Sequence, residues 1–269
     1  MDDIKVALIT LNSVCGKTRE NLDKHLKWIE KASLADAGIV CFPELSLTGY
    51  SSKESFTRFA QEIPCNYTES LSNIAKKMDI TILAGIAESD INGKRYASHI
   101  SFHPNGEYSI YRKIHLAPPE QKLYEKGGDL SLTNIKGISC GIQLCYDIHF
   151  PELSTAMTKN GAEIIFVPHA SPRGTPEVKY KSWMRHLRAR AYDNSVFILA
   201  CNQSGENGMG LSFSGVSVAI DPSGEVIDKR LDNTDGMLLV NLKKEIFDHV
   251  RGHKMRHFFP NRRPEVYKL

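Results

Sequence analysis

Residues 138–170 read ISCGIQLCYDIHFPELSTAMTKNGAEIIFVPHA, and this stretch decides the fold class. It opens with the pattern of a buried strand, then passes Pro151 into a helical pattern that Gly161 ends, and continues as a second apolar strand. A strand, a helix and a second strand in this order are typical of a sheet covered by helices. The sequence therefore predicts an α/β fold.

The same alternation continues toward both ends of the chain. We expect further helices over residues 17–35, 68–78 and 176–194, and further strands over residues 4–12, 37–44, 80–88 and 195–203. The turn signals at Pro104-Asn105-Gly106 and Pro222-Ser223-Gly224 predict two hairpins, so parallel and antiparallel pairing must coexist. The order strand, helix, strand, helix, hairpin occurs twice, which suggests two similar halves.

Composition is that of one globular domain over residues 1–269. Hydrophobic residues make up 41% of the chain, which suffices for a sizeable core. The net charge is only +3, and the basic residues are interspersed with acidic ones, so we expect no nucleic-acid partner. Two acidic residues follow Met1, and the chain has no apolar run of membrane-spanning length, which predicts a cytoplasmic protein that does not bind membranes.

Six cysteines are scattered without a CxxC pair or histidines at zinc spacing, so we interpret them as reduced thiols and expect no metal site. The segment 251–269 is basic and irregular, yet it contains HFFPNRRPEVYKL, which is too apolar for a solvated tail. We expect this tail to pack on another surface, such as a second subunit.

Three reactive side chains follow apolar runs at expected strand ends: Glu44, Lys113 and Cys145. Each has a structural interpretation when taken alone. Glu44 could cap a helix or form a salt bridge, Lys113 could lie on an exposed edge strand, and Cys145 could be a small buried hydrophobe. Because loops beyond strand ends converge in sheets covered by helices, the three side chains could also meet in one crevice.

Together, these residues supply the parts that amide cleavage by a thiol requires. Cys145 would attack the carbonyl carbon and form an acyl intermediate. Glu44 would accept the thiol proton, pass it to the departing amine and later activate water. Lys113 and the backbone N–H of Tyr146 would stabilise the oxyanion.

The strings FPELSLTGY, YRKIHL and CYDIHFPE resemble, in this order, the three signature motifs of the nitrilase superfamily, also called carbon-nitrogen hydrolases. HLAPPEQKLYEKGGD is similar to the segment that carries a second catalytic glutamate in that family, here Glu120, and LRARAYDN and RRPEVY resemble later segments. The resemblance implies an αββα sandwich with two mixed sheets, a homodimer or larger homo-oligomer, and no metal or organic cofactor.

The resemblance also implies a small amide or N-carbamoyl compound as substrate, with a nitrile as the alternative. A non-catalytic dimerising scaffold would be expected to lack part of the triad, and a redox protein would be expected to have a CxxC pair. His149 occupies a position where many relatives carry an arginine, so no carboxylate anchor is predicted there. The candidate substrate contacts are Tyr50, Tyr146, His149, His169, Ser171 and Arg173.

Overall fold

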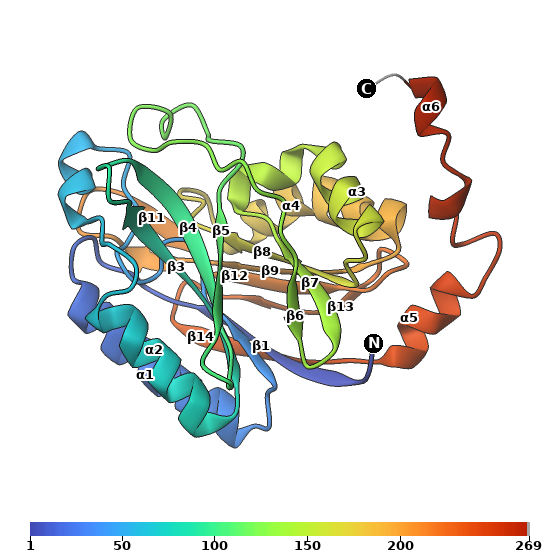
Figure 1. The fold of residues 1–269 in the computed structure, drawn as a ribbon, viewed down its shortest axis with the longest axis horizontal. Helices are drawn as coiled ribbons and strands as arrows, with labels where there is room; N and C mark the ends of the chain where they lie inside the picture. Colours follow the sequence, from blue (N-terminus) through green and yellow to red (C-terminus); the bar gives the residue numbers. More distant parts are fainter. Residues whose placement is uncertain (268–269) are drawn as a thin grey trace.

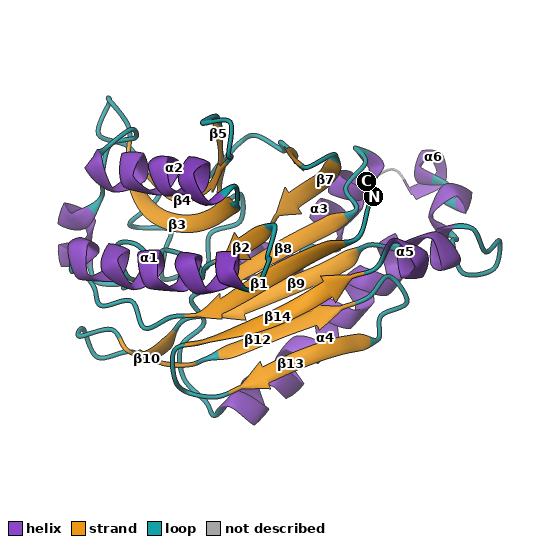
Figure 2. Cartoon of the chain, turned by 90° about the horizontal axis from the view of Figure 1, so that it is seen from below, coloured by secondary structure: helices purple, strands orange, loops and turns teal. Residues whose placement is uncertain are grey.

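The computed structural model describes residues 1–267 and consists of two six-stranded sheets packed face to face, with helices on both outer faces (Figure 1). Helices α1 (Thr18–Leu34) and α2 (Asn66–Met78) cover one sheet, and helices α3 (Pro151–Lys159) and α4 (Pro176–Asn194) cover the other (Figures 1 and 2). The predicted αββα sandwich is therefore confirmed, and α4 has the predicted bounds.

The first sheet has the strand order β14-β1-β2-β3-β4-β5. Strands β1 to β3 run parallel to one another, whereas β14, β4 and β5 pair antiparallel. Its strands are β1 (Ile4–Thr10), β2 (Ile39–Cys41), β3 (Thr81–Ser89), β4 (Arg95–Phe102), β5 (Tyr108–Arg112) and β14 (Gly236–Leu242). Both kinds of pairing coexist in this sheet, as the hairpin signals predict.

The second sheet repeats this arrangement with the order β13-β12-β9-β8-β7-β6. Strands β7 to β9 are parallel, and the outer pairings are antiparallel. Its strands are β6 (Thr133–Ile135), β7 (Ile138–Ile142), β8 (Ile164–His169), β9 (Phe197–Asn202), β12 (Val216–Ile220) and β13 (Val226–Leu231). Each half of the chain thus contributes strand, helix, strand, helix, strand and hairpin, which confirms the two similar halves.

Shorter elements complete the chain. Strands β10 (Ser204–Glu206) and β11 (Ser212–Ser214) form a two-stranded ribbon. The 3-10 helices are η1 (Glu54–Phe59), η2 (Cys145–His149) and η3 (Phe259–Asn261), and the remaining α-helices are α5 (Lys244–Arg251) and α6 (Pro264–Tyr267). Among the described residues, no helix has the combination of length and apolar character that crossing a membrane requires.

Strand β1 shows how the sequence builds the layers. Ile4, Val6 and Leu8 belong to the core cluster that fills the space between the sheets, whereas Ala7 and Ile9 belong to the cluster beneath α1 and α2. Successive side chains of a strand point to opposite faces, so a continuous apolar run is buried on both sides. This double burial fixes the register of the strand that leads toward the site.

The C-terminal segment extends away from the sandwich at the right of Figure 1. Its contacts with the body include the Phe258 ring against Tyr192 and an Arg262 hydrogen bond of 3.0 Å to the Thr155 hydroxyl. Met255 is 84% exposed, and Val266 is exposed as well. Packing of residues 251–269 at a subunit interface stays a prediction, and residues 268–269 lie outside the described part of the chain.

Candidate active site

The centre of the site is the ammonium group of Lys113, which lies between two carboxylates. Its Nζ is 2.7 Å from Glu44 Oε1 and 2.9 Å from Glu120 Oε2. All three side chains are buried. A buried cation is tolerated when carboxylates compensate its charge, and one lysine between two acids leaves the group with a net negative charge when both acids are ionised.

Glu44 lies in a tight turn rather than at the end of a strand, because β2 ends at Cys41, three residues earlier than predicted. The next residue, Leu45, has a positive φ of 52°, which turns the chain. Gly85 of β3 allows this turn to lie close, since a Cβ there would come within 2.2 Å of the Leu45 nitrogen. Backbone N–H of Ala170 donates to Glu44 Oε2 at 2.9 Å and fixes the carboxylate.

Lys113 directly follows β5, as predicted. Glu120 belongs to the loop after it, and its Oε2 accepts a hydrogen bond of 2.9 Å from the backbone N–H of Ala117. The loop therefore brings Glu120 back to a lysine that is only seven positions earlier. The structure thus places together the two acids and the lysine that the sequence singled out.

Cys145 is the first residue of η2, since β7 ends at Ile142 rather than at the cysteine. Its φ is 47°, a left-handed conformation that is uncommon for a residue other than glycine. Asp147 holds this turn: one carboxylate oxygen accepts from the Leu144 N–H at 3.0 Å and from the Tyr111 hydroxyl at 2.8 Å. Strained backbone of this kind persists only where surrounding contacts impose it.

Burial sets the protonation of the two acid–base groups at the site. It raises the pKa of Glu44 to about 7, because the raising effects of desolvation and of the Glu120 charge exceed the lowering effect of Lys113. Burial alone would lower the pKa of Lys113, but Glu44 and Glu120 outweigh it and raise that pKa well above its usual value. Lys113 therefore stays charged, while Glu44 changes protonation near neutrality.

The Cys145 thiol lies within reach of these charges. Burial is the main cause that raises the pKa of the thiol, the carboxylates Glu44 and Glu120 add to the rise, and Lys113 and the Ala170 N–H oppose it. The Cys145 thiol is therefore neutral at rest. It needs a base to become reactive, and a carboxylate with a pKa of about 7 is close by.

Tyr50 is buried near the same groups, and burial, followed by the Glu120 and Glu44 charges, raises the pKa of its phenol. Ser171 and His169 lie on either side of Ala170, whose N–H reaches Glu44. The imidazole of His169 is 2% exposed and stacks on Trp183 with 4.0 Å between ring centroids. These predicted contacts lie close to the reactive groups.

Of the other predicted contacts, His149 and Arg173 lie farther out. Tyr146 follows Cys145 and packs against His149, with 5.5 Å between ring centroids, and His149 is exposed. Arg173 is exposed, and its side chain forms no hydrogen bond or ion pair within residues 1–267. Arg173 and His149 are thus placed at the surface of the structure rather than against the buried charges.

Residues 5–248 match the carbon-nitrogen hydrolase family. The chain belongs to that family. This hydrolase is 30% identical over 224 residues to an (R)-stereoselective amidase from Pseudomonas sp., covering 83% of this chain and 80% of the relative. It is also 30% identical over 263 residues to a probable nitrilase from Schizosaccharomyces pombe, covering 95% and 93% of the two chains.

The fold comparison agrees. Nit3 from Saccharomyces cerevisiae, a member of branch 10 of the nitrilase superfamily, superposes with a TM-score of 0.84 at 26% sequence identity. The match covers 93% of the hydrolase and 94% of Nit3. The family and the sandwich architecture that the three sequence motifs predict are therefore confirmed.

Sequence reasoning missed several residues of the site. Tyr124 is buried, its hydroxyl has no partner among residues 1–267, and burial followed by the Glu120 charge raises the pKa of its phenol. Asp147 anchors the Cys145 turn, and the Trp183 ring stacks on His169. Tyr124 lies in the motif HLAPPEQKLYEKGGD and Asp147 in CYDIHFPE. Their closeness in sequence to Glu120 and Cys145 could have identified them as site residues. The contact between Trp183 and His169 joins α4 to β8, and no pattern in the local sequence predicts it.

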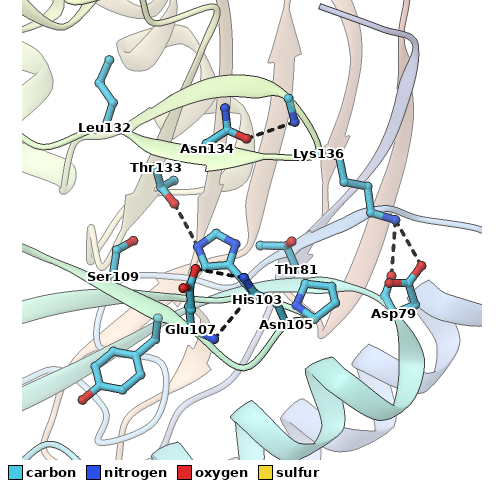
Figure 3. A pocket seen from close by; sticks show the side chains of 13 residues that line it. Asp79, Thr81, His103, Asn105, Glu107, Ser109, Leu132, Thr133, Asn134 and Lys136 are labelled. Atoms are coloured by element: carbon cyan, nitrogen blue, oxygen red, sulfur yellow. Dashed lines mark hydrogen bonds and ion pairs between the residues drawn. The ribbon is translucent and has the colours of Figure 1, made fainter.

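A surface depression of about 590 Å³ lies elsewhere on the hydrolase (Figure 3). None of the candidate catalytic or substrate-binding residues lines it. Its polar groups pair with one another: His103 with Thr133 at 3.1 Å, and Lys136 with Asp79 at 3.5 Å. Within residues 1–267, no group of three or more His, Cys, Asp or Glu residues is arranged to hold a metal ion.

Proposed function

We propose that the hydrolase cleaves the carbon–nitrogen bond of a small linear amide or N-carbamoyl compound through an acyl intermediate on Cys145. The observation that supports this best is a buried Glu44, with a pKa of about 7, which is paired with Lys113 and lies next to a neutral thiol. A base whose pKa lies near the working pH is well suited to proton transfer in both directions.

In the first half of the reaction, Glu44 accepts the proton of Cys145 as the sulfur attacks the carbonyl carbon. The resulting tetrahedral intermediate carries its negative charge on oxygen. Lys113 is suited to stabilise this charge, because an ammonium has three N–H donors and the two carboxylates need only two of them. The backbone N–H of Tyr146 is our second proposed donor.

In the second half, the carbon–nitrogen bond breaks and Glu44 returns its proton to the departing ammonia or amine. A thioester on Cys145 remains. Glu44 then accepts a proton from water, which attacks the thioester carbon, and the released thiolate regains its proton from Glu44. Glu120 holds Lys113 in place throughout, so we assign it a positioning role.

The class of substrate is less narrowly defined than the reaction mechanism. The relatives include an amidase and a probable nitrilase, so both kinds of substrate have to be compared. We favour an amide or N-carbamoyl compound, because nitrile-hydrolysing members usually carry a tryptophan after the nucleophile, whereas this chain has Tyr146. A non-catalytic scaffold would be expected to lack part of the buried charge group, which is complete here.

The test is a panel of short aliphatic amides, N-carbamoyl amines, N-carbamoyl amino acids and nitriles, assayed for ammonia and for carbon dioxide. We expect ammonia release from amides, and carbon dioxide in addition if N-carbamoyl compounds are the better substrates. Glu44→Gln should abolish turnover on the whole panel. Ammonia release from nitriles alone would favour the nitrilase alternative, and no turnover on any compound would favour the scaffold.

We further propose that the hydrolase forms a homodimer or a larger homo-oligomer, and that its C-terminal segment, residues 251–269, packs at a subunit interface. The exposed apolar side chains Met255, Val266 and Tyr267 support this, because isolated chains rarely leave such a series of side chains in water.

A further inference from the structure

We propose that His25 of α1 is a positioning residue for Glu44 and that it acts through the hydroxyl of Ser46. The inference rests on the proposed function, because it concerns the carboxylate that is assigned there as the base. His25 is buried and lies outside the sequence motifs that carry the reactive groups. Its link to the site is made only by the fold, through contacts of α1 with the turn that follows β2.

His25 contacts the chain on both sides of Glu44. Its ring packs against Phe42, with 4.2 Å between ring centroids. Its Nε2 lies 2.9 Å from the hydroxyl oxygen of Ser46. Phe42 is two residues before Glu44, and Ser46 is two residues after it. One buried side chain of α1 therefore touches both ends of the short segment that carries the carboxylate.

The two ring nitrogens of His25 have different roles. Nδ1 lies 2.7 Å from the carbonyl oxygen of Asn21, an atom that only accepts, so Nδ1 carries the proton. Burial lowers the pKa of the ring to about 4, so the ring is neutral near pH 7 and Nε2 is an acceptor. The Ser46 hydroxyl therefore donates to Nε2, and its oxygen accepts the backbone N–H of Gly85 at 3.3 Å. A continuous chain of hydrogen bonds thus runs from β3 through the turn to α1.

Asn21 adds a second contact from the same face of α1. It lies four residues before His25, a spacing that places both side chains on one side of the helix. Its Nδ2 donates to the carbonyl of Leu47 at 2.9 Å and to the carbonyl of Val14 at 2.9 Å. Its Oδ1 accepts the backbone N–H of Val14 at 3.1 Å. Side chains of α1 therefore hold both Ser46 and Leu47 in the turn.

The turn that these contacts hold is strained. Leu45, between Glu44 and Ser46, has a φ of 52°, and such a conformation persists only where surrounding contacts impose it. The Glu44 carboxylate needs this turn, because its two oxygens lie 2.7 Å from Lys113 Nζ and 2.9 Å from the Ala170 nitrogen. Without the Ser46 bond, the carboxylate should spend less time at these distances. It would then lose part of the lowering effect of Lys113 on its pKa.

The experiment measures the rates of His25→Leu, Ser46→Ala and the double variant at a temperature where circular dichroism shows each to be folded. Each single variant should lower kcat by at least about tenfold and change KM by less than about threefold. The rising limb of kcat/KM against pH should move to higher pH by about half a unit or more, because Glu44 is held less closely to Lys113. Since the two residues act as one unit, the double variant should be no slower than the slower single variant.

Two further variants serve as controls. His25→Gln places an amide oxygen where it can accept from Ser46, so it should restore most of kcat and the wild-type limb. Thr68→Val removes a buried hydroxyl of α2 that bonds the Cys65 N–H and carbonyl, each at 2.8 Å, and should lower the melting temperature without moving the limb.

A purely structural role of His25 would give the same result as Thr68→Val, namely a lower melting temperature, an unmoved limb and an unchanged kcat of the folded protein. That result, or losses that multiply in the double variant, overturns the inference and leaves the proposed function intact. Ser46→Ala removes a single oxygen atom, so it carries the test even if His25→Leu folds poorly.

Alkylation of Cys145 by iodoacetamide tests the inference without turnover. The sulfur displaces iodide while Glu44 accepts the thiol proton, so the wild-type rate should rise as the pH increases through about 7. In Ser46→Ala, the rise should occur at higher pH, as mass spectrometry of the Cys145 peptide can measure. Identical pH profiles contradict the role of His25 and Ser46 even if no amide is ever hydrolysed. Failure of the proposed function, in contrast, would be absence of turnover on every amide by a wild type whose Cys145 is alkylated in this way.

Discussion

The Tyr111 hydroxyl donates a hydrogen bond of 2.8 Å to the carboxylate of Asp147, and this bond joins the two sheets at the site. Tyr111 lies on β5 of the first sheet, two residues before Lys113, and Asp147 lies in η2 beside the second sheet, two residues after Cys145. Together with the backbone N–H of His115, which donates to the same carboxylate at 2.7 Å, this buried contact links the lysine-bearing strand to the Cys145 turn.

Removing this bond should impair both stability and rate. We expect Tyr111→Phe to lower the free energy of unfolding by about 1–3 kcal/mol, because it leaves a buried carboxylate oxygen with one donor fewer. kcat should fall, since the Cys145 turn loses a restraint. Tyr108→Phe, on the exposed part of the same strand, is the control. Urea denaturation and initial rates measure both effects, and identical behaviour of the two variants would contradict the account.

The pH profile should reflect Glu44. Only the ionised carboxylate accepts the thiol proton, and its pKa is about 7, so kcat/KM should rise as the pH increases through that value. Below it, the rate should fall about tenfold per pH unit. The measurement is kcat/KM from pH 5 to 9 with a neutral amide, and a flat profile across pH 6–8 argues against Glu44 as the base.

Glu120 offers a directional test of the same assignment. Its charge raises the pKa of Glu44, so Glu120→Gln should move the rising limb of the profile to lower pH while also reducing the maximal rate. The exposed Glu125 of the same loop provides the control Glu125→Gln, which should leave the limb unmoved. A shift of the rising limb toward higher pH in Glu120→Gln would contradict the assignment of this limb to Glu44.

Gly85→Ala should disturb Glu44 without touching a reactive group. The added Cβ would meet the Leu45 nitrogen at 2.2 Å, and a backbone atom cannot swing aside as a side chain end can. We expect a loss of about 1–3 kcal/mol of stability and at least a hundredfold loss of kcat. Gly128→Ala, where nothing lies within 4 Å of the added atom, should behave like the wild type.

The proposed dimer can be tested on the full chain. Met255→Asp combined with Val266→Asp should shift the hydrolase toward monomer in sedimentation velocity, because charges replace apolar side chains at the proposed interface. Ile91→Asp is a matched control, since Ile91 is 94% exposed in a turn far along the chain from the tail. Sedimentation of the wild-type protein as a monomer would contradict the proposed oligomer.

The sequence predicted the layers well because the apolar patterns of the strands and helices are local. It placed α4 correctly and predicted the hairpin after β4, whose turn residues carry the signal. It did not predict β14, because that strand is recognised by its pairing with β1, more than two hundred residues away. Long-range pairing of this kind has no local signature.

At the site, the sequence identified Glu44, Lys113 and Glu120 but placed Glu44 and Cys145 at strand ends. Both strands end three residues earlier, and left-handed residues then turn the chain: Leu45 after the glutamate, and Cys145 itself. Residues other than glycine rarely adopt this conformation, so the residue types at positions 45 and 145 did not predict the turns.

The central claim is that the sulfur of Cys145 is the nucleophile. Ammonia release by purified Cys145→Ala, measured at saturating concentration of the best amide from the panel, tests it most directly, with Cys140→Ala as a buried-thiol control. The account predicts a loss of at least about ten-thousandfold in kcat for Cys145→Ala at an unchanged melting temperature. Turnover in that variant within tenfold of the wild type would contradict it.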